Sequence, residues 1–238
     1  MQDEEKELLK VGTDALFAPF ANLIGKLFGG AAEEIGAMLR DQVTNRRKIR
    51  QIRLFKKLSA AIEDSGIHPR QIPDNIWIPA LEAASVEDDE SIQELWVNLL
   101  ANAADLETGE RIHKVHVSIL RELTSEGARF LDALFGNGKI DLFTQGQLIV
   151  MAAERGLIRA DGYELPKLSQ IISMLRRQGL LELAPTPVAD HTETTNEEGE
   201  QNLQLRGINL VPRYELTPLA VAFLEACRAP GMRGRRMA

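Results

Sequence analysis

The residue types that most often bind metals in proteins occur together at two places in this sequence. His113 and His116 lie three residues apart, so a helix would present both imidazoles on one face. A structural metal site usually needs four ligands, and no cysteine or further histidine stands at ligand spacing from this pair. The acidic run Glu87 to Glu90 lacks the alternating ligands and the glycine of a calcium loop. We therefore expect two surface histidines, an acidic helix start and no bound metal.

Nucleophilic or cofactor chemistry is not indicated by any local motif. The one cysteine, Cys227, has no local base signature, and the Gly-x-Ser-x-Gly turn of serine hydrolases does not occur. The stretch GKLFGG at 25–30 has neither the spacing nor the Lys-Ser ending of a phosphate-binding loop. We expect no catalytic residue, no cofactor and no enzymatic activity. The protein is expected to act by binding.

The composition is that of a globular protein with blocks of charge. The 238 residues suffice for one large or two small domains, and a net charge of −7 argues against a protein that coats nucleic acid with its whole surface. A single cysteine excludes an intramolecular disulfide, which fits a reducing compartment. The acidic start does not resemble a secretory signal, and no run of about 18 uncharged apolar residues occurs. We expect a cytoplasmic protein, or one that is peripheral at the inner membrane.

Residues 1–40 are an amphipathic, glycine-rich segment, and a basic stretch follows it. Between Arg40 and Lys57 there are eight Lys or Arg and one acid, with an apolar stripe that ends near Gly66. Aromatic bulk beside cations is typical of helices that bind at a membrane surface. The candidate residues for membrane contact or self-association are Phe17, Phe20, Phe28, Arg46, Arg47 and Lys48. The alternative, which we favour, is that the apolar stripe packs into a helical domain and the cations are solvated.

Residues 41–138 are predicted to form a helical domain. A short helix is expected after Pro79, and Ser85–Asp88 has the form of a capping box for the next helix. Asn98 and Asn102 lie one turn apart at the border of that helix's apolar stripe. They could pair with a neighbouring helix or a subunit, but we favour a solvated helix face. Thr124 is expected to cap a later helix that ends at 136–138. The apolar stripe of the strongest helix comprises Ile92, Leu95, Trp96, Leu99, Leu100 and Ala103.

Residues 139–238 have the element order of a winged helix-turn-helix module. The expected elements are a helix at 145–155, a helix from Pro166 to Gly179, a strand at 180–185, an acidic wing loop at 185–202, a second strand segment at 203–216 and a helix capped by Thr217. The in-out alternation of the second strand segment shifts at Gly207, which predicts a bulge there. The fold class is therefore mainly α, with a small β-hairpin near the C-terminus.

The helix after Pro166 is the candidate recognition helix. Lys167, Gln170 and Arg177 lie along one of its faces, and Arg176 is adjacent. Arg and Gln are the side chains that read guanine and adenine edges in the major groove. The acidic loop at 185–202 argues against DNA, because phosphate contacts require cations. Winged modules also serve as protein-contact or dimer modules, so both interpretations remain open.

Two segments of the chain stand out, IPALEAASVEDDESIQELWVNLLANAAD with the following ILRELTSEGARFL, and YELTPLAVAFLEAC near the C-terminus. Both resemble the bacterial Abi-alpha family. Val97 stands where the family usually has alanine, and Ala220 where glycine is commoner. The resemblance implies phage defence by abortive infection, in which an infected cell stops phage spread, but it carries no established catalytic residues. Its motif residues Trp96, Asn98 and Asn102 are expected to be structural.

These observations favour an all-α N-terminal domain joined near residue 138 to a winged-helix C-terminal domain. We expect an abortive-infection factor that acts by binding, at a membrane surface through residues 8–57 or, alternatively, as a DNA-binding regulator. A protein partner or a homo-oligomer is expected, and no small-molecule substrate is evident.

Overall fold

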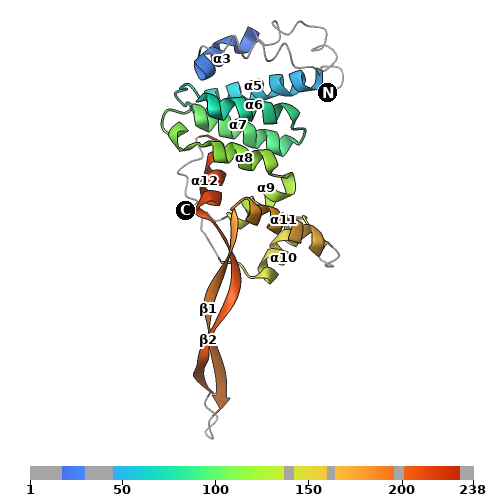
Figure 1. Cartoon of the computed structure of the whole chain (residues 1–238), viewed down its shortest axis with the longest axis vertical. Helices are drawn as coiled ribbons and strands as arrows, with labels where there is room; N and C mark the ends of the chain where they lie inside the picture. Colours follow the sequence, from blue (N-terminus) through green and yellow to red (C-terminus); the bar gives the residue numbers. More distant parts are fainter. Residues whose placement is uncertain (1–17, 30–44, 137–141, 160–163, 196–200, 231–238) are drawn as a thin grey trace. The chain divides into compact units, whose positions relative to one another are not determined.

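The fold is mainly helical, with one two-stranded antiparallel hairpin, as predicted (Figure 1). The computed structural model describes residues 18–29, 45–136, 142–159, 164–195 and 201–230. Contacts divide the chain into two compact units, Met1–Ala128 with Ala222–Ala238 (unit 1) and Arg129–Val221 (unit 2). The three-part division inferred from the sequence remains a prediction. Among the described helices, none is both long and apolar enough to cross a membrane.

Unit 1 begins with short helical pieces and then the basic helix, as the sequence predicts. The 3-10 helix η1 spans Ala18–Phe20, α3 spans Ala21–Phe28, and α5 spans Asn45–Ser65. Gly66 ends α5 with φ +63°, a conformation that glycine adopts without the strain a side chain would cause. The inner face of α5 is buried through Ile49, Ile52, Leu54, Phe55, Leu58 and Ile62.

The next two helices differ from the predicted boundaries. Helix α6 spans Asp74–Val86, so it begins before Pro79 and contains it. Ser85 lies in its last turn, where its hydroxyl donates to the carbonyl of Glu82 at 2.7 Å. The predicted capping box at Ser85–Asp88 is therefore wrong, because α6 continues through the residue that was expected to cap the following helix.

The cap of that following helix is Asp89. Helix α7 spans Glu90–Ala104, and Asp89 Oδ1 accepts from the backbone N–H groups of Ser91 (2.9 Å) and Ile92 (3.1 Å). The hydrogen bond from the Ser91 hydroxyl, followed by the one from the Ile92 backbone, lowers the pKa of Asp89 below its ordinary value. Asp89 therefore supports the helix start as an anion, where the helix dipole favours negative charge.

Further helical elements of this region come next along the chain. The 3-10 helix η3 spans Gly109–Arg111, α8 spans Lys114–Glu122, and α9 spans Ser125–Leu134. The predicted cap of α9 is confirmed, since Thr124 Oγ1 accepts from the N–H of Gly127 at 3.1 Å. In unit 1, α5 packs on α6 and α7, and α8 packs on the other side of α6 and α7 (Figure 1). The largest buried side chains of this unit are Trp77, Trp96, Phe28, Phe55 and Phe223.

Unit 2 contains two helices with the predicted ends. Helix α10 spans Gln145–Glu154 and is capped by Thr144, whose Oγ1 accepts from the N–H of Gln147 at 3.2 Å. Helix α11 spans Leu165–Arg177, so it begins one residue before the predicted Pro166, and it is followed by Gly179 with φ +71°. Its apolar side chains Leu168, Ile171, Ile172 and Leu175 are buried.

The hairpin is longer than predicted. Strand β1 spans Leu181–Thr195 and pairs in antiparallel fashion with β2, Gln201–Leu216. Residues 185–195 are therefore strand, and the prediction of a loop from 185 to 202 is wrong there because the backbone pairing continues past the prolines. The predicted bulge is confirmed, since the register passes from Asp190 opposite Gly207 to His191 opposite Leu205.

Two further features lie at the base of the hairpin and directly after it. Phe143 forms an isolated antiparallel bridge with Tyr214, and each residue's N–H donates to the other's carbonyl, at 2.7 and 2.8 Å. Helix α12 spans Pro218–Ala226, and Thr217 caps it as predicted, accepting from the N–H of Ala220 at 3.1 Å.

Candidate functional site

Two blocks of charge that are separate in sequence meet in unit 1. Arg50 of α5 lies 3.7 Å from the carboxylate of Asp88, and Lys57 lies 3.1 Å from Glu90 and 3.7 Å from Glu94. The carboxylates are largely exposed, so each pair contributes well under about 1 kcal/mol. The acidic run that could have attracted a cation thus faces cations of the chain itself.

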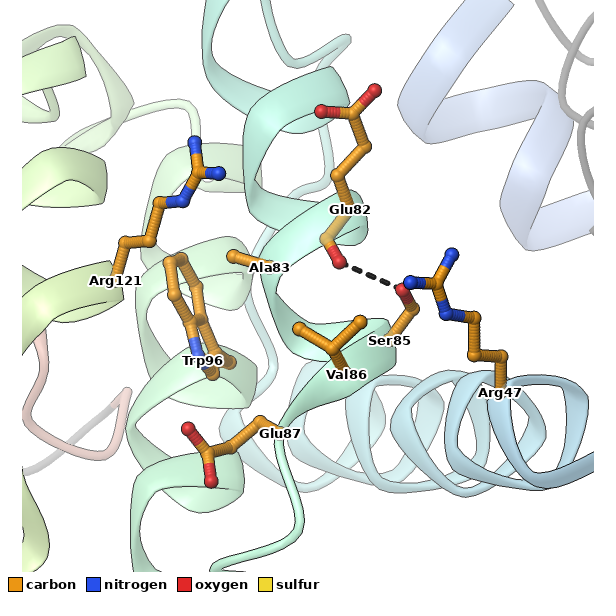
Figure 2. Close-up of a pocket in the computed structure, with 8 residues that line it drawn as sticks. All are labelled: Arg47, Glu82, Ala83, Ser85, Val86, Glu87, Trp96 and Arg121. Carbon is orange, nitrogen blue, oxygen red and sulfur yellow. Dashed lines mark hydrogen bonds between the residues drawn. The ribbon is translucent and has the colours of Figure 1, made fainter. Parts of the chain in front are cut away.

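A pocket of about 430 Å³ opens beside these charge pairs, among α5, α6, α7 and α8 (Figure 2). Arg121 and Arg47 stand on opposite sides of the view, with the Trp96 indole and Val86 between them. Two guanidinium groups and two carboxylates around one pocket suit a polar ligand that carries both signs of charge. The lining residues are Arg47, Glu82, Ala83, Ser85, Val86, Glu87, Trp96 and Arg121.

Only some of the residues that line this pocket were singled out from the sequence. Arg47 was a candidate for membrane contact and Trp96 a motif residue, whereas Glu82 and Arg121 were not singled out. The residues come from four helices, so no local spacing in the sequence could have shown that they converge.

The outer face of α5 is cationic over residues 46–56, and Glu63 and Asp64 are exposed near its C-terminal end. Arg46, Arg53 and Lys56 are exposed and fall within an arc of about 80° at 100° per residue. Arg47 and Lys48 are half-buried. Over residues 46–56 the helix therefore separates an apolar inner face from an outer face that carries positive charge.

The aromatic candidates of the N-terminal segment are placed differently from the cations. Phe28 is fully buried, with ring centroids 4.9 Å from Trp77 and 6.3 Å from Phe55. Phe20 is half-buried and stacks on Phe55 at 6.3 Å. Phe17 lies outside the described residues. The packing of Phe28 matches the alternative in which the apolar stripe belongs to the helical core, and its ring does not reach the surface.

The motif residues of α7 differ in their surroundings. Trp96 and Asn102 are each 1% exposed, and Asn98 is half-buried. Asn102 Nδ2 donates to the carbonyls of Ala226 (2.7 Å) and Arg228 (2.8 Å). The solvated helix face that we favoured is therefore wrong for Asn102, whose amide joins α7 to the end of α12 across 124 positions of sequence.

The histidine pair occupies the start of α8. His113 is the N-cap residue, and its N–H donates to Nδ1 of His116 at 3.2 Å, with the rings stacked 5.9 Å apart. His116 is 2% exposed, so the expectation of two surface histidines is wrong for it. Burial lowers the pKa of His116, and the neighbouring His113 lowers it further. The hydrogen bond requires a neutral imidazole with its proton on Nε2.

Acid is expected to destabilise unit 1 through His116. Because its folded-state pKa lies below the unfolded value of 6.5, the unfolded chain binds more protons below that pH. The contribution of neutral His116 is thus complete above the unfolded pKa and is lost as the pH falls below it. His116→Gln, which keeps an acceptor for His113, should flatten this part of the pH dependence in urea unfolding between about pH 7.5 and pH 5.5. Parallel pH profiles for the two proteins would contradict the assignment.

Cys227 is a core residue. It is 3% exposed, and burial raises the pKa of its thiol far above the ordinary value, so it stays protonated. Within the described ranges, no three His, Cys, Asp or Glu side chains gather in a way that could hold a metal ion.

Helix α11 presents the candidate recognition residues on its solvent side. Lys167, Gln170, Arg176 and Arg177 are all exposed, opposite the buried apolar stripe. At 100° per residue, Lys167, Gln170 and Arg177 share one face of the helix, whereas Arg176 lies on the opposite flank from Lys167.

Comparison with known proteins gives one family. A family model described as abortive infection alpha matches residues 44–227. The match runs from the start of α5 to Cys227 and so includes both the α7 motif and the hairpin. Neither the curated proteins nor the solved structures contain a match to the chain.

Proposed function

The chain belongs to the abortive infection alpha family, which implies a role in phage defence, and on that premise we propose that it acts by binding an anionic membrane surface through the outer face of α5. The proposal assigns the protein a binding function rather than a catalytic one. Two side chains with reactive chemistry support this, because His116 accepts the backbone N–H of His113 at the start of α8 and the Cys227 thiol is buried.

The observation that carries the proposal is the separation of charge on α5. Its apolar side chains face the core, its flank pairs with the acids of 88–94, and its outer face carries Arg46, Arg53 and Lys56. Anionic lipid attracts cations near its surface by about 1 kcal/mol each. Since Phe28 is buried, attraction by these cations supplies the binding energy, and insertion of that ring does not.

Binding to anionic vesicles is expected to weaken about 30-fold in Arg46→Gln/Lys56→Gln, because two contributions of about 1 kcal/mol are lost. Flotation of the full chain with phosphatidylcholine vesicles, with and without phosphatidylglycerol, measures this. Arg111→Gln/Lys114→Gln is the matched control, since it removes one Arg and one Lys that are also exposed in unit 1. Equal weakening in both variants, or no preference for the anionic vesicles, would contradict the proposal.

A second candidate function is DNA binding by unit 2, favoured by the bridge between Phe143 and Tyr214. A helix, a single bridging residue, two helices and a hairpin follow in the order of a winged helix module, with the bridge where the short first strand would stand. In that case the full chain would bind duplex DNA with an affinity that falls steeply with salt and depends on Arg176 and Arg177, while vesicle binding stays absent.

A further inference from the structure

The indole of Trp96 carries a hydrogen-bond donor that has no acceptor in the described part of the chain. The other indole N–H, that of Trp77, donates to Asp74 at 3.0 Å, and the Trp96 side chain is 1% exposed. Buried polar groups are nearly always hydrogen-bonded, so an unused donor indicates a water or a ligand beside it. The Trp96 indole lines the pocket of unit 1, and in Figure 2 its nitrogen lies on the side of the ring toward Glu87.

The Glu87 carboxylate is held in place by the protein itself. Its Oε1 accepts from the backbone N–H groups of Asp88 and Asp89, both at 2.9 Å. The backbone carbonyl of Glu87 accepts from Nε2 of Gln93 at 2.8 Å. Among the described residues, Glu87 Oε2 has no partner. A half-buried carboxylate of fixed position therefore offers one oxygen to a donor in the pocket, and such preorganisation lowers the cost of binding.

Cations flank the pocket, but its lining carries no net charge. Arg121 of α8 is exposed and forms no ion pair within the described ranges, and Arg47 of α5 is half-buried on the opposite side of Figure 2. Val86 lies between them and is 50% exposed, which gives the lining an apolar patch. The two arginines are balanced by Glu82 and Glu87. A polyphosphate or a polyamine would meet as much repulsion as attraction here.

We propose that this pocket binds a free α-amino acid as its zwitterion. The ammonium group donates to Oε2 of Glu87, and the carboxylate accepts from the Trp96 indole and from Arg121. An α-amino acid carries both charged groups on one carbon, so it can use a fixed acceptor and an unused donor that line the same pocket. Its side chain extends over Val86 toward Arg47. The volume of about 430 Å³ leaves room for that side chain and lies in the range of small-molecule sites.

Isothermal titration calorimetry of the full chain with each of the common protein amino acids tests the site. At least one is expected to bind with a dissociation constant below about 1 mM. Arg121→Gln should raise that constant at least about tenfold, because it removes the cation that pairs with the ligand carboxylate. Arg111→Gln is the matched control, since Arg111 is also an exposed arginine of unit 1 but does not line the pocket. It should change the constant less than about twofold.

Blocked ligands and a further variant test the individual contacts. The N-acetylated and the amidated forms of the amino acid that binds lack the ammonium and the carboxylate, and each should bind at least about tenfold more weakly. Trp96→Phe keeps an aromatic ring and removes the N–H, so it should raise the dissociation constant about fivefold. Circular dichroism must show each variant folded.

Three results would overturn the proposal. The first is a wild-type chain that binds none of the amino acids, and the second is equal weakening by Arg121→Gln and Arg111→Gln. The third is a blocked form that binds as tightly as the free amino acid, because the pocket would then not recognise the charge that the block removes.

Discussion

Replacing Asn102 with alanine is expected to lower the free energy of unfolding by about 2–4 kcal/mol, measured by urea denaturation. The side chain is 1% exposed and its Nδ2 donates to the carbonyls of Ala226 and Arg228. Removing the amide leaves two carbonyls without these donors, and a buried polar group without its partner costs about 1–3 kcal/mol. The loss falls on the contact that holds the end of α12 against α7.

Two companion variants identify the cause of that loss. Asn98→Ala, one turn earlier and half-buried, should cost about 0.5 kcal/mol or less. Asn102→Asp keeps the size of the side chain but replaces the donor with a carboxylate that faces two carbonyl oxygens, so it should destabilise at least as much as alanine. If Asn102→Ala and Asn98→Ala had equal effects, the hydrogen bonds would not be the cause.

Replacing Phe28 with alanine is expected to cost about 3–5 kcal/mol of unfolding free energy, the usual range for a buried aromatic side chain. Its ring is fully buried between Trp77 and Phe55, so truncation removes apolar contacts and leaves a cavity. The backbone carbonyl of the preceding residue, Leu27, also accepts from the N–H of Ile72 at 2.7 Å, which fixes this segment against the helical core. Thermal and urea unfolding of the full chain measure the effect.

Phe20→Ala is the control for this prediction, because its ring is half-buried and stacks on Phe55 alone among the described aromatic rings. It should cost about 1 kcal/mol. The same pair of variants separates core packing from lipid contact at the N-terminal segment. Unchanged unfolding of Phe28→Ala together with weaker binding to anionic vesicles would contradict the burial of this ring and would indicate that it inserts into lipid.

The helix ends followed from the sequence wherever one local interaction decides them. Thr124 and Thr217 cap their helices as predicted, and Gly66 and Gly179 follow α5 and α11 in left-handed backbone conformations. The prediction of Ser85 as a cap was wrong because two capping residues, Ser85 and Asp89, lie within five positions. Helix α6 continues to Val86, so Asp89 caps the following helix. The choice between such caps depends on where the preceding helix packs.

The length of the hairpin was missed for a related reason. Prolines and acids between 185 and 200 have low strand propensity, and this composition predicts a loop. In an antiparallel ribbon, a proline whose nitrogen faces the outer edge removes no hydrogen bond of the ladder. Pro185 and Pro212 stand opposite each other at such a position. Local propensity therefore underestimates the length of a strand whose prolines stand at positions that donate no hydrogen bond to the ladder.

The sequence by itself determined the mainly helical class, the hairpin, most helix ends and the membership in the family, because these depend on periodicity, on caps and on a motif read along the chain. Only the tertiary structure decided the role of single side chains. It buried Asn102 against the end of α12, removed Phe28 from the surface and brought Arg47 and Arg121 to one pocket. Each of these facts depends on which distant segment lies opposite a given face, and helical spacing specifies a face without specifying its partner.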